Sequence, residues 1–209
     1  MLADHIWTNG MAVGRAIAEM PLRFDGFAGN PRKSDLVIFG QVEGKGVVVA
    51  AEAKADEAFG PLIGEYREQN LGTGSRIPDR IDQLARAIFG RSRVDADIAS
   101  LRYQLVHALA GVLAEAGRRG LSRSVLLIHE FRSRHLNNVK VKQNANDLDH
   151  FAQVVTEGRA EIVPSGRLIG PFRVPGGGMI PTNSYFLIGK VVTYLVSPGV
   201  VRSEPELPY

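Results

Sequence analysis

The chain has 209 residues, of which 44% are hydrophobic and 22% charged, and this suits one globular domain or one domain with a small appendage. It contains no cysteine, which excludes disulfides, thiolate zinc sites and cysteine nucleophiles. The formal net charge of +3 says little by itself about partners. No apolar run approaches the ~20 residues that cross a bilayer, and the N-terminal MLADHIW lacks a basic start and a long apolar core. We therefore expect no membrane partner and a cytoplasmic location.

The N-terminal part of the chain predicts one helix followed by two strands. Residues 4–20 predict a helix, because apolar side chains recur at loose helical spacing and Asp4 stands where an N-cap would. Residues 34–40 and 46–55 predict short strands, and the intervening VEGKG turn favours an antiparallel hairpin. Residues 47–51 are apolar at every position, which is typical of a central strand covered on both faces.

The rest of the chain predicts more helices around a third strand, and then a segment of different composition. Helices are expected at 76–90, 100–117 and 146–158, and a strand at 122–131. After residue 160, Gly and Pro become frequent, with strand-like pieces at 160–163, 167–169 and 185–196. The order predicts an α/β or α+β fold, in which a mixed sheet is covered by helices. We divide it into a core, 1–158, and a β-rich C-terminal extension packed on it, 159–209.

Two carboxylates and a lysine are expected to meet at one end of the hairpin. Glu52 and Lys54 follow the apolar run and point to the same face, because alternate residues of a strand do so. In the antiparallel pair, Asp35 near the start of one strand lies beside the end of the other. Two carboxylates repel each other and are costly to bury, so they favour a shared cation. Lys54 supplies part of that charge, and a divalent metal would supply the rest.

Such a cluster has the composition of a phosphodiester-hydrolysing site. Mg²⁺ binds through one or two carboxylates and keeps water and phosphate oxygens as its other ligands. The ion acidifies its bound water and neutralises charge on the phosphate, while a lysine orients the attacking water. Asp35 and Glu52 are therefore candidate ligands for Mg²⁺ or Mn²⁺, and Lys54 is a candidate catalytic residue.

The pattern Ser34-Asp35, sixteen residues, then Glu52-Ala53-Lys54 resembles the PD-(D/E)XK nuclease superfamily. The resemblance implies a restriction-endonuclease-like αββαβ core and cleavage of nucleic acid, most simply DNA. It also implies an acidic metal ligand on the first helix, for which Glu19 is the candidate, and a site glutamine on the helix before the third strand, for which Gln104 is the candidate. A single small nuclease domain often needs a second copy to cut both strands, so the resemblance also allows a homodimer.

Three longer stretches are similar to a bacterial family of PD-(D/E)XK-like proteins whose function is not established. They are EAKADEAFGPLIGEY, RYQLVHALAGVLAEA and VLLIHEF. The resemblance covers roughly residues 35–155. It departs from the superfamily pattern at Ser34, where a proline is expected, and in the Gly-rich C-terminal extension.

Several of these features also have simpler explanations. Glu52 and Lys54 could be a solvated ion pair, worth under about 1 kcal/mol. His107 lies four residues after Tyr103, and a packing or hydrogen-bonding pair is expected there in preference to catalysis. The spacing of His129, Glu130 and His135 matches no zinc motif.

A basic stretch suits phosphate contacts, although a solvated basic edge would look the same. It contains Arg118, Arg119, Arg123, Arg132, Arg134, Lys140 and Lys142 against one acid, Glu130.

Three functions from different classes remain open. The first hypothesis is a metal-dependent nuclease using Asp35, Glu52, Lys54 and Gln104. The second is a catalytically inactive nucleic-acid-binding or scaffolding module of the same fold. The third is a small-molecule enzyme or ligand-binding protein with a pocket beneath the Gly-rich loop.

Overall fold

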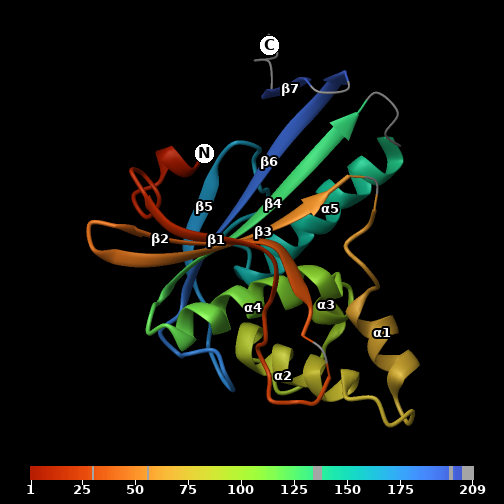
Figure 1. Cartoon of the computed structure of the whole chain (residues 1–209). Helices are drawn as coiled ribbons and strands as arrows, with labels where there is room; N and C mark the ends of the chain where they lie inside the picture. The colour runs from red at the N-terminus through yellow and green to blue at the C-terminus, as the bar shows by residue number, and fades with distance from the viewer. Residues whose placement is uncertain (30, 56, 134–137, 198–199, 204–209) are drawn as a thin grey trace.

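A mixed seven-stranded sheet forms the centre of the protein, in the order β1-β2-β3-β4-β6-β5, with β7 paired to β6 (Figure 1). The computed structural model describes residues 1–209 except 30, 56, 134–137, 198–199 and 204–209. The strands are β1 (Ala12–Pro21), β2 (Lys33–Val42), β3 (Lys45–Lys54), β4 (Arg123–Ser133), β5 (Leu168–Arg173), β6 (Tyr185–Ser197) and β7 (Val200–Ser203). The helices are the short 3₁₀ helix η1 (Leu2–Asp4), α1 (Ile63–Asn70), α2 (Ile77–Phe89), α3 (Ala96–Ala99), α4 (Tyr103–Arg118) and α5 (Asn138–Val155).

The predicted hairpin is confirmed. β2 and β3 pair antiparallel, with Val42 opposite Lys45 at the turn and Leu36 opposite Ala51 near the other end. β3, β4 and β6 then run parallel to one another. Their carboxyl ends therefore meet at one edge of the sheet, and β3 ends there with Lys54.

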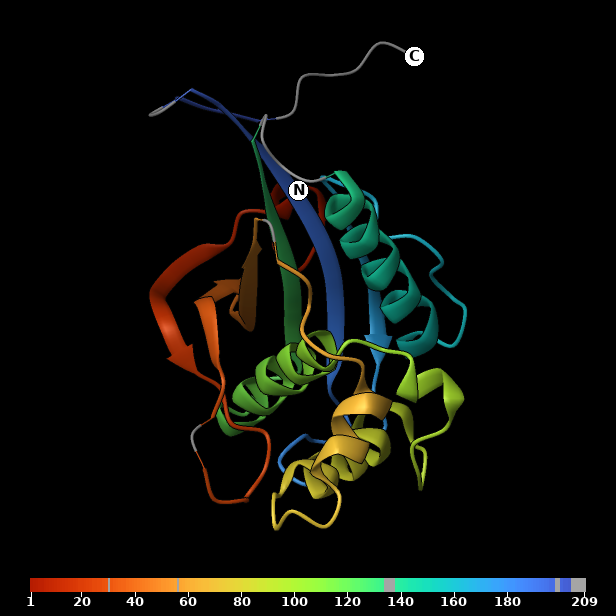
Figure 2. The same ribbon diagram turned by 90° about the vertical axis from the view of Figure 1, so that its right-hand side faces the viewer.

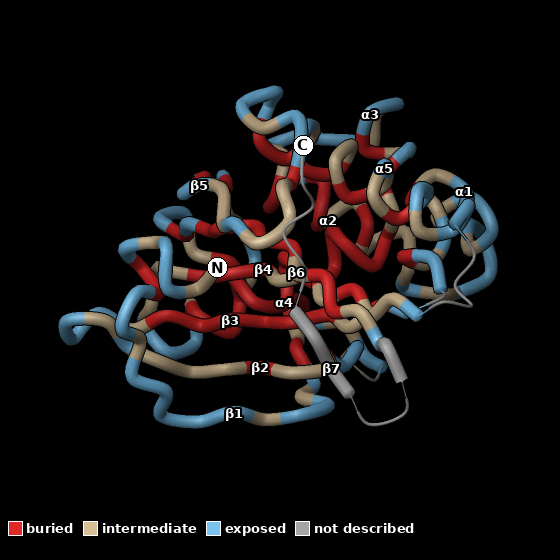
Figure 3. Tube along the Cα trace, turned by 90° about the horizontal axis from the view of Figure 1, so that it is seen from above, coloured by how far each residue is buried: buried red, intermediate tan, exposed pale blue. Residues whose placement is uncertain are grey.

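β3 is buried on both faces, as its apolar run predicts. Val48 and Ala50 belong to the main core, which the helices cover, whereas Val47 and Val49 belong to a smaller core on the opposite face with Trp7. The N-terminal segment thus covers the face of the sheet that the helices leave. Figure 2 shows α4 lying across the strands with α5 beside them, and Figure 3 shows the buried β3 next to the more exposed β2 and β1.

The predicted helices after residue 75 are present. α4 is more deeply placed than its single apolar stripe suggests, because every residue from Tyr103 to Ala116 is buried. α5 begins eight residues before the predicted start at 146, but its predicted stripe is confirmed: Leu148, Phe151, Ala152 and Val155 are all buried.

The prediction of a helix over residues 4–20 is wrong. Only η1 is helical there, and residues Ala12–Pro21 form the edge strand β1, antiparallel to β2. The apolar residues that suggested a helical stripe serve two different elements: Trp7 packs under the sheet, while Ile17 and Met20 lie half-buried on β1. Pairing to β2 outweighs the weak helical pattern, which two glycines interrupt.

The C-terminal segment contributes to the central sheet itself. Of the three strand-like pieces expected after residue 160, those at 167–169 and 185–196 correspond to β5 and β6, whereas 160–163 is not a strand. β6 lies between β4 and β5, so residues 159–209 supply an inner strand. Among the described residues, no helix is long and apolar enough to span a membrane.

Truncation of Phe151 tests how strongly α5 is held on the sheet. The Phe151 side chain is fully buried in the main core, so Phe151→Ala should lower the free energy of unfolding by about 3–5 kcal/mol. Gln153→Ala changes an exposed position of the same helix and should stay within about 0.5 kcal/mol of the unaltered protein. Chemical denaturation measures both, and a loss below about 1 kcal/mol for Phe151→Ala would contradict this packing.

Candidate active site

The hairpin places Asp35 beside the end of β3, as its sequence predicts. The Asp35 Oδ2 atom accepts a hydrogen bond from the backbone N–H of Ala53, at 2.6 Å. Ala53 is the middle residue of the Glu52-Ala53-Lys54 triplet. This bond ties the carboxylate to the strand that carries the other two charged side chains.

Gln104 connects the two charges of β3. Its Nε2 donates to Glu52 Oε2 at 2.9 Å, and its Oε1 accepts from Lys54 Nζ at 2.9 Å. All three side chains are buried, with exposed fractions of 5% or less. The second residue of α4 thus faces the sheet between Glu52 and Lys54, where the sequence resemblance expects a glutamine.

Lys54 makes a second contact from the loop that follows β3. Its Nζ donates to Glu57 Oε1 at 3.0 Å and lies 5.4 Å from the centre of the Phe59 ring. The same loop holds the start of α4, because the carbonyls of Phe59 and Pro61 accept from the N–H groups of Gln104 and Tyr103. The lysine and the glutamine are therefore positioned by one short segment.

Arg102 ties this segment to α5. Its Nε donates to Asp147 on α5 at 2.8 Å, and its Nη1 donates to the carbonyl of Gly60 at 3.1 Å. Asn144, on the same helix, donates to the carbonyl of Glu57 at 2.9 Å. The first turn of α4 and the loop before it are thus anchored on the helix layer.

Asp35 and Glu52 carry negative charge that no neighbouring cation directly pairs. Burial raises the pKa of Glu52, the hydrogen bond from Gln104 lowers it, and the negative charge of Asp35 raises it further, with a net upward shift. Neither carboxylate forms an ion pair with any residue that the structure describes. The ammonium of Lys54 bonds to Gln104 and Glu57 instead. Glu52 is therefore linked to the lysine only indirectly, through the amide of Gln104.

The two carboxylates offer the type of ligand atom that a hard divalent cation prefers. They offer oxygen atoms, which Mg²⁺ and Mn²⁺ prefer, and an ion with two protein ligands completes its shell with water and substrate oxygens. No group of three or more His, Cys, Asp or Glu residues suited to a metal occurs in the described part of the chain. Asp35 and Glu52 are therefore a pair of carboxylates that belongs to no larger group of this kind.

Glu19 lies on β1 and not on a first helix. Its neighbours Ala18 and Met20 pair with Leu36 and Ser34, so the register places Glu19 across from Asp35. Its backbone has φ of 51°, and its exposed carboxylate lies 3.9 Å from Lys33 Nζ. The structure does not bring it into a three-carboxylate group with Asp35 and Glu52.

Sequence reasoning missed the residues that hold Lys54 and Gln104 in place. Glu57 and Phe59 lie in the run ADEAFG directly after the motif, and their closeness to Lys54 was the available signal. The partnership of Arg102 with Asp147 spans 45 residues, and no local pattern indicates it.

The other charged features of the sequence are dispersed. In the basic stretch, Arg118 and Arg119 both pair with Glu115, and Arg132 pairs with Glu130. His129 and Glu130 are consecutive in β4 and point to opposite faces, and His129 Nε2 lies 2.8 Å from Thr193 Oγ1. Arg134 and His135 lie outside the described residues.

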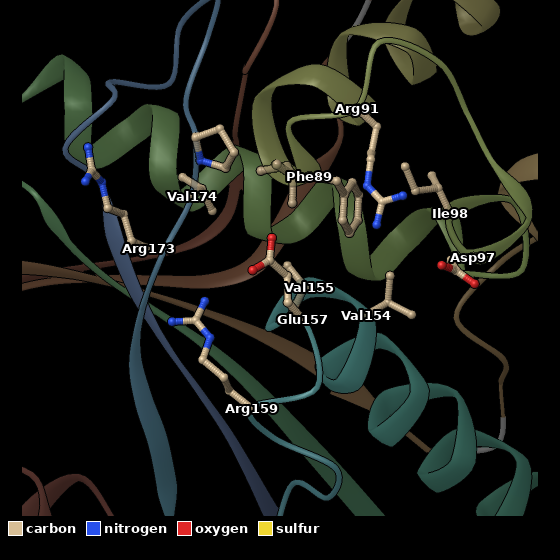
Figure 4. Close-up of a pocket in the computed structure, with 12 residues that line it drawn as sticks. Phe89, Arg91, Asp97, Ile98, Val154, Val155, Glu157, Arg159, Arg173 and Val174 are labelled. Carbon is tan, nitrogen blue, oxygen red and sulfur yellow. The ribbon is translucent and has the colours of Figure 1, made fainter.

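A cavity of about 160 Å³ lies away from this cluster (Figure 4). It is bordered by the end of α2, the end of α5 and β5, with Arg91, Arg159 and Arg173 near Asp97 and Glu157. None of its lining residues belongs to the Asp35–Glu52–Lys54–Gln104 cluster. Its charged side chains are exposed, so it has the character of a surface depression.

The raised pKa of Glu52 predicts how one substitution changes stability with pH. Above the ordinary value of 4.5 the folded protein binds more protons at this group than the unfolded chain does, so its contribution to stability falls as the pH rises from 4.5 through the raised pKa. Glu52→Gln removes the charge and retains an acceptor for Gln104. Without added metal, its free energy of unfolding should exceed that of the unaltered protein at neutral pH.

This stability difference should shrink as the pH falls below 4.5, where Glu52 is protonated in both states. Chemical denaturation in a chelator across this range measures it. Glu65→Gln, at an exposed position of α1, is the matched control and should show no such trend. A pH-independent difference between Glu52→Gln and the unaltered protein would contradict the assigned burial of charge.

Comparisons with known proteins give one finding. No curated protein and no solved structure matches the chain. A family model matches residues 1–179, which covers the hairpin, α4 and every residue of the cluster described above. On that match, the chain belongs to the family described as Domain of unknown function (DUF6946).

Proposed function

We propose that this protein is a metal-dependent nuclease with a restriction-endonuclease-like core, which hydrolyses phosphodiester bonds of nucleic acid, most simply DNA. The observation that carries the proposal is the unpaired negative charge of Asp35 and Glu52 beside a buried lysine that one glutamine holds. A divalent cation would compensate that charge. It would also supply what phosphodiester hydrolysis requires, since it lowers the pKa of a bound water and neutralises charge on the phosphate.

Each residue of the cluster has a distinct task in this proposal. Asp35 uses Oδ2 for the N–H of Ala53, which leaves Oδ1 available to an ion. Glu52 is oriented by the amide of Gln104. Lys54 has three N–H donors, of which Gln104 and Glu57 take two, and the third is available to orient a water or a phosphate oxygen.

The catalytically inactive module of the same fold is the second candidate, and one observation favours it. Lys54 is only 3% exposed and is bonded to two acceptors, as in a purely structural ion pair. In that case nucleic acid would bind without turnover. Metal titration and cleavage assays separate the two candidates.

Asp35→Asn tests the metal site. The asparagine retains an oxygen acceptor for the N–H of Ala53 but lacks the charge, so the fold should persist. We expect Mn²⁺ binding by calorimetry to be lost and cleavage of a panel of DNA and RNA substrates to fall by at least ~10²-fold. Asp97→Asn, at the exposed rim of the 160 Å³ cavity, is the matched control and should leave both unchanged. Undiminished cleavage by Asp35→Asn would refute the assignment of Asp35.

Lys54→Met tests whether the ammonium acts in the reaction. The methionine replaces the buried stem but not the charge, so cleavage should fall by about 10²–10⁴-fold while Mn²⁺ still binds. The unpaired Oε1 of Gln104 should also cost about 1–3 kcal/mol of stability. Glu57→Gln removes only the negative charge of the exposed partner of Lys54, retains its oxygen acceptor and should retain most activity. Full activity in Lys54→Met would assign the lysine to a structural role.

A further inference from the structure

A second cavity, of about 300 Å³, lies beside the first turns of α4, where Tyr103 and His107 line it. Its lining residues come from the loop between β1 and β2 and from α1, α2 and α4. Tyr103, which lines it, directly precedes Gln104, so the first turn of α4 contributes both to this cavity and to the Asp35–Glu52–Lys54–Gln104 cluster. Hydrogen bonds hold the loop against α2: Arg80 donates to Asp25, and Gln83 donates to the carbonyl of Phe24.

Two nearly buried polar side chains line this cavity without a hydrogen-bond partner. Tyr103 and His107 are 7% and 8% exposed, and their rings contact each other with centroids 5.6 Å apart, as the packing pair expected from the sequence. The Tyr103 hydroxyl and the His107 ring nitrogens bond to no described residue, yet they are not sealed from solvent. Buried polar groups usually have partners, so these donors are available to a molecule in the cavity.

The charge around the cavity is positive. Arg80 is paired with Asp25 at 3.0 Å, and the guanidinium of Arg23 donates to the carbonyls of Phe27 and Gly29. Arg32 also lines the cavity: its carbonyl accepts a hydrogen bond from the N–H of Leu22, whereas its guanidinium forms no hydrogen bond or ion pair with any described residue. Three arginines against one aspartate leave an excess of positive charge, with one guanidinium unpaired.

The ionisation states of the ring residues suit an anionic ligand. Burial, with the charges of Arg32 and Arg80, lowers the pKa of His107 to about 3, so its imidazole is neutral near pH 7 and retains one N–H. Burial raises the pKa of Tyr103 to about 12, so its hydroxyl remains a donor. The charge of Arg32 also acts on Glu52 and lowers its pKa, so this guanidinium, which lines the cavity, interacts electrostatically with the Asp35–Glu52–Lys54–Gln104 cluster.

We propose that this cavity binds a phosphate group through Arg32, Tyr103 and His107, and that the phosphate belongs to the nucleic-acid strand cut at Asp35 and Glu52. The second half of the proposal rests on the function proposed above. A tetrahedral phosphate can accept from donors that approach from different elements, and a guanidinium pairs with two of its oxygens at once. A strand phosphate here would position the strand relative to the neighbouring metal cluster.

Binding of inorganic phosphate by the full chain tests the cavity directly. Calorimetry in a chelator should detect phosphate binding that weakens at least 10-fold in Arg32→Gln and about 3- to 10-fold in Tyr103→Phe, which retains the ring. Arg86→Gln makes the same charge change at an exposed position of α2 outside the cavity and should bind as the unaltered protein does. Equal binding by Arg32→Gln, or no binding by the unaltered protein, would overturn the proposal.

A short oligothymidylate, used in the same chelator, identifies the source of the phosphate. Its affinity should fall in Arg32→Gln by a factor similar to that for inorganic phosphate. An oligonucleotide affinity that is independent of Arg32, with phosphate binding still dependent on it, would overturn the assignment to a strand.

The proposed nuclease function has a separate readout. Asp35→Asn should bind inorganic phosphate normally while it loses metal and cleavage. Absence of cleavage by the unaltered protein, together with Arg32-dependent phosphate binding, would refute the nuclease and leave the phosphate site standing.

Discussion

The side-chain amide of Gln104 lies between a buried glutamate and a buried lysine and bonds to both. An amide can do this because it carries a donor and an acceptor on adjacent atoms, so it satisfies two opposite charges without adding one. The rest of the site depends on that geometry. It holds the end of the central strand against the first turn of α4. Lys54 bonds to Gln104 and Glu57 and does not pair directly with Asp35 or Glu52.

The surrounding structure maintains this contact from several directions. In the loop after β3, Glu57 accepts a hydrogen bond from the lysine and the Phe59 ring lies beside it, and the carbonyls of this loop hold the start of α4. Arg102 then links that loop to Asp147 on α5. The helix layer therefore has a role besides covering the core, because it positions one amide to within hydrogen-bonding distance of two charges. Side chains locked by such supporting bonds are typical of sites in which geometry matters for function.

The pair of carboxylates imposes a cost that the fold relieves only in part, because Gln104 bonds to Glu52 and the net pKa shift of Glu52 is still upward. Burial and mutual repulsion raise the pKa of Glu52, and no described cation pairs with either group. A protein selected only for stability would have little reason to retain them there. Shifted ionisation in a cluster of this kind is a physical indication of function, and the proposed metal accounts for it. The neighbouring cavity is lined by an excess of positive charge, and one of its arginines, Arg32, acts electrostatically on Glu52.

Local patterns in the sequence determined the hairpin, the buried central strand, the three helices 77–89, 103–118 and 138–155 in their main parts, and the meeting of Asp35 with Glu52. Those features follow from periodicities of two or 3.6 residues and from a short turn, which are properties of neighbouring residues. The place of Gln104 in the site was anticipated through a family resemblance. Its bonds to Glu52 and Lys54 were not, since 52 residues separate it from Glu52 and no local pattern links the two. Only the tertiary structure decided that residues 12–21 form an edge strand, that β6 enters the sheet beside β4, and that a cationic cavity forms behind Tyr103. Each of these depends on pairing or packing between distant segments, whose free energy exceeds the small differences in local preference that a sequence pattern reports.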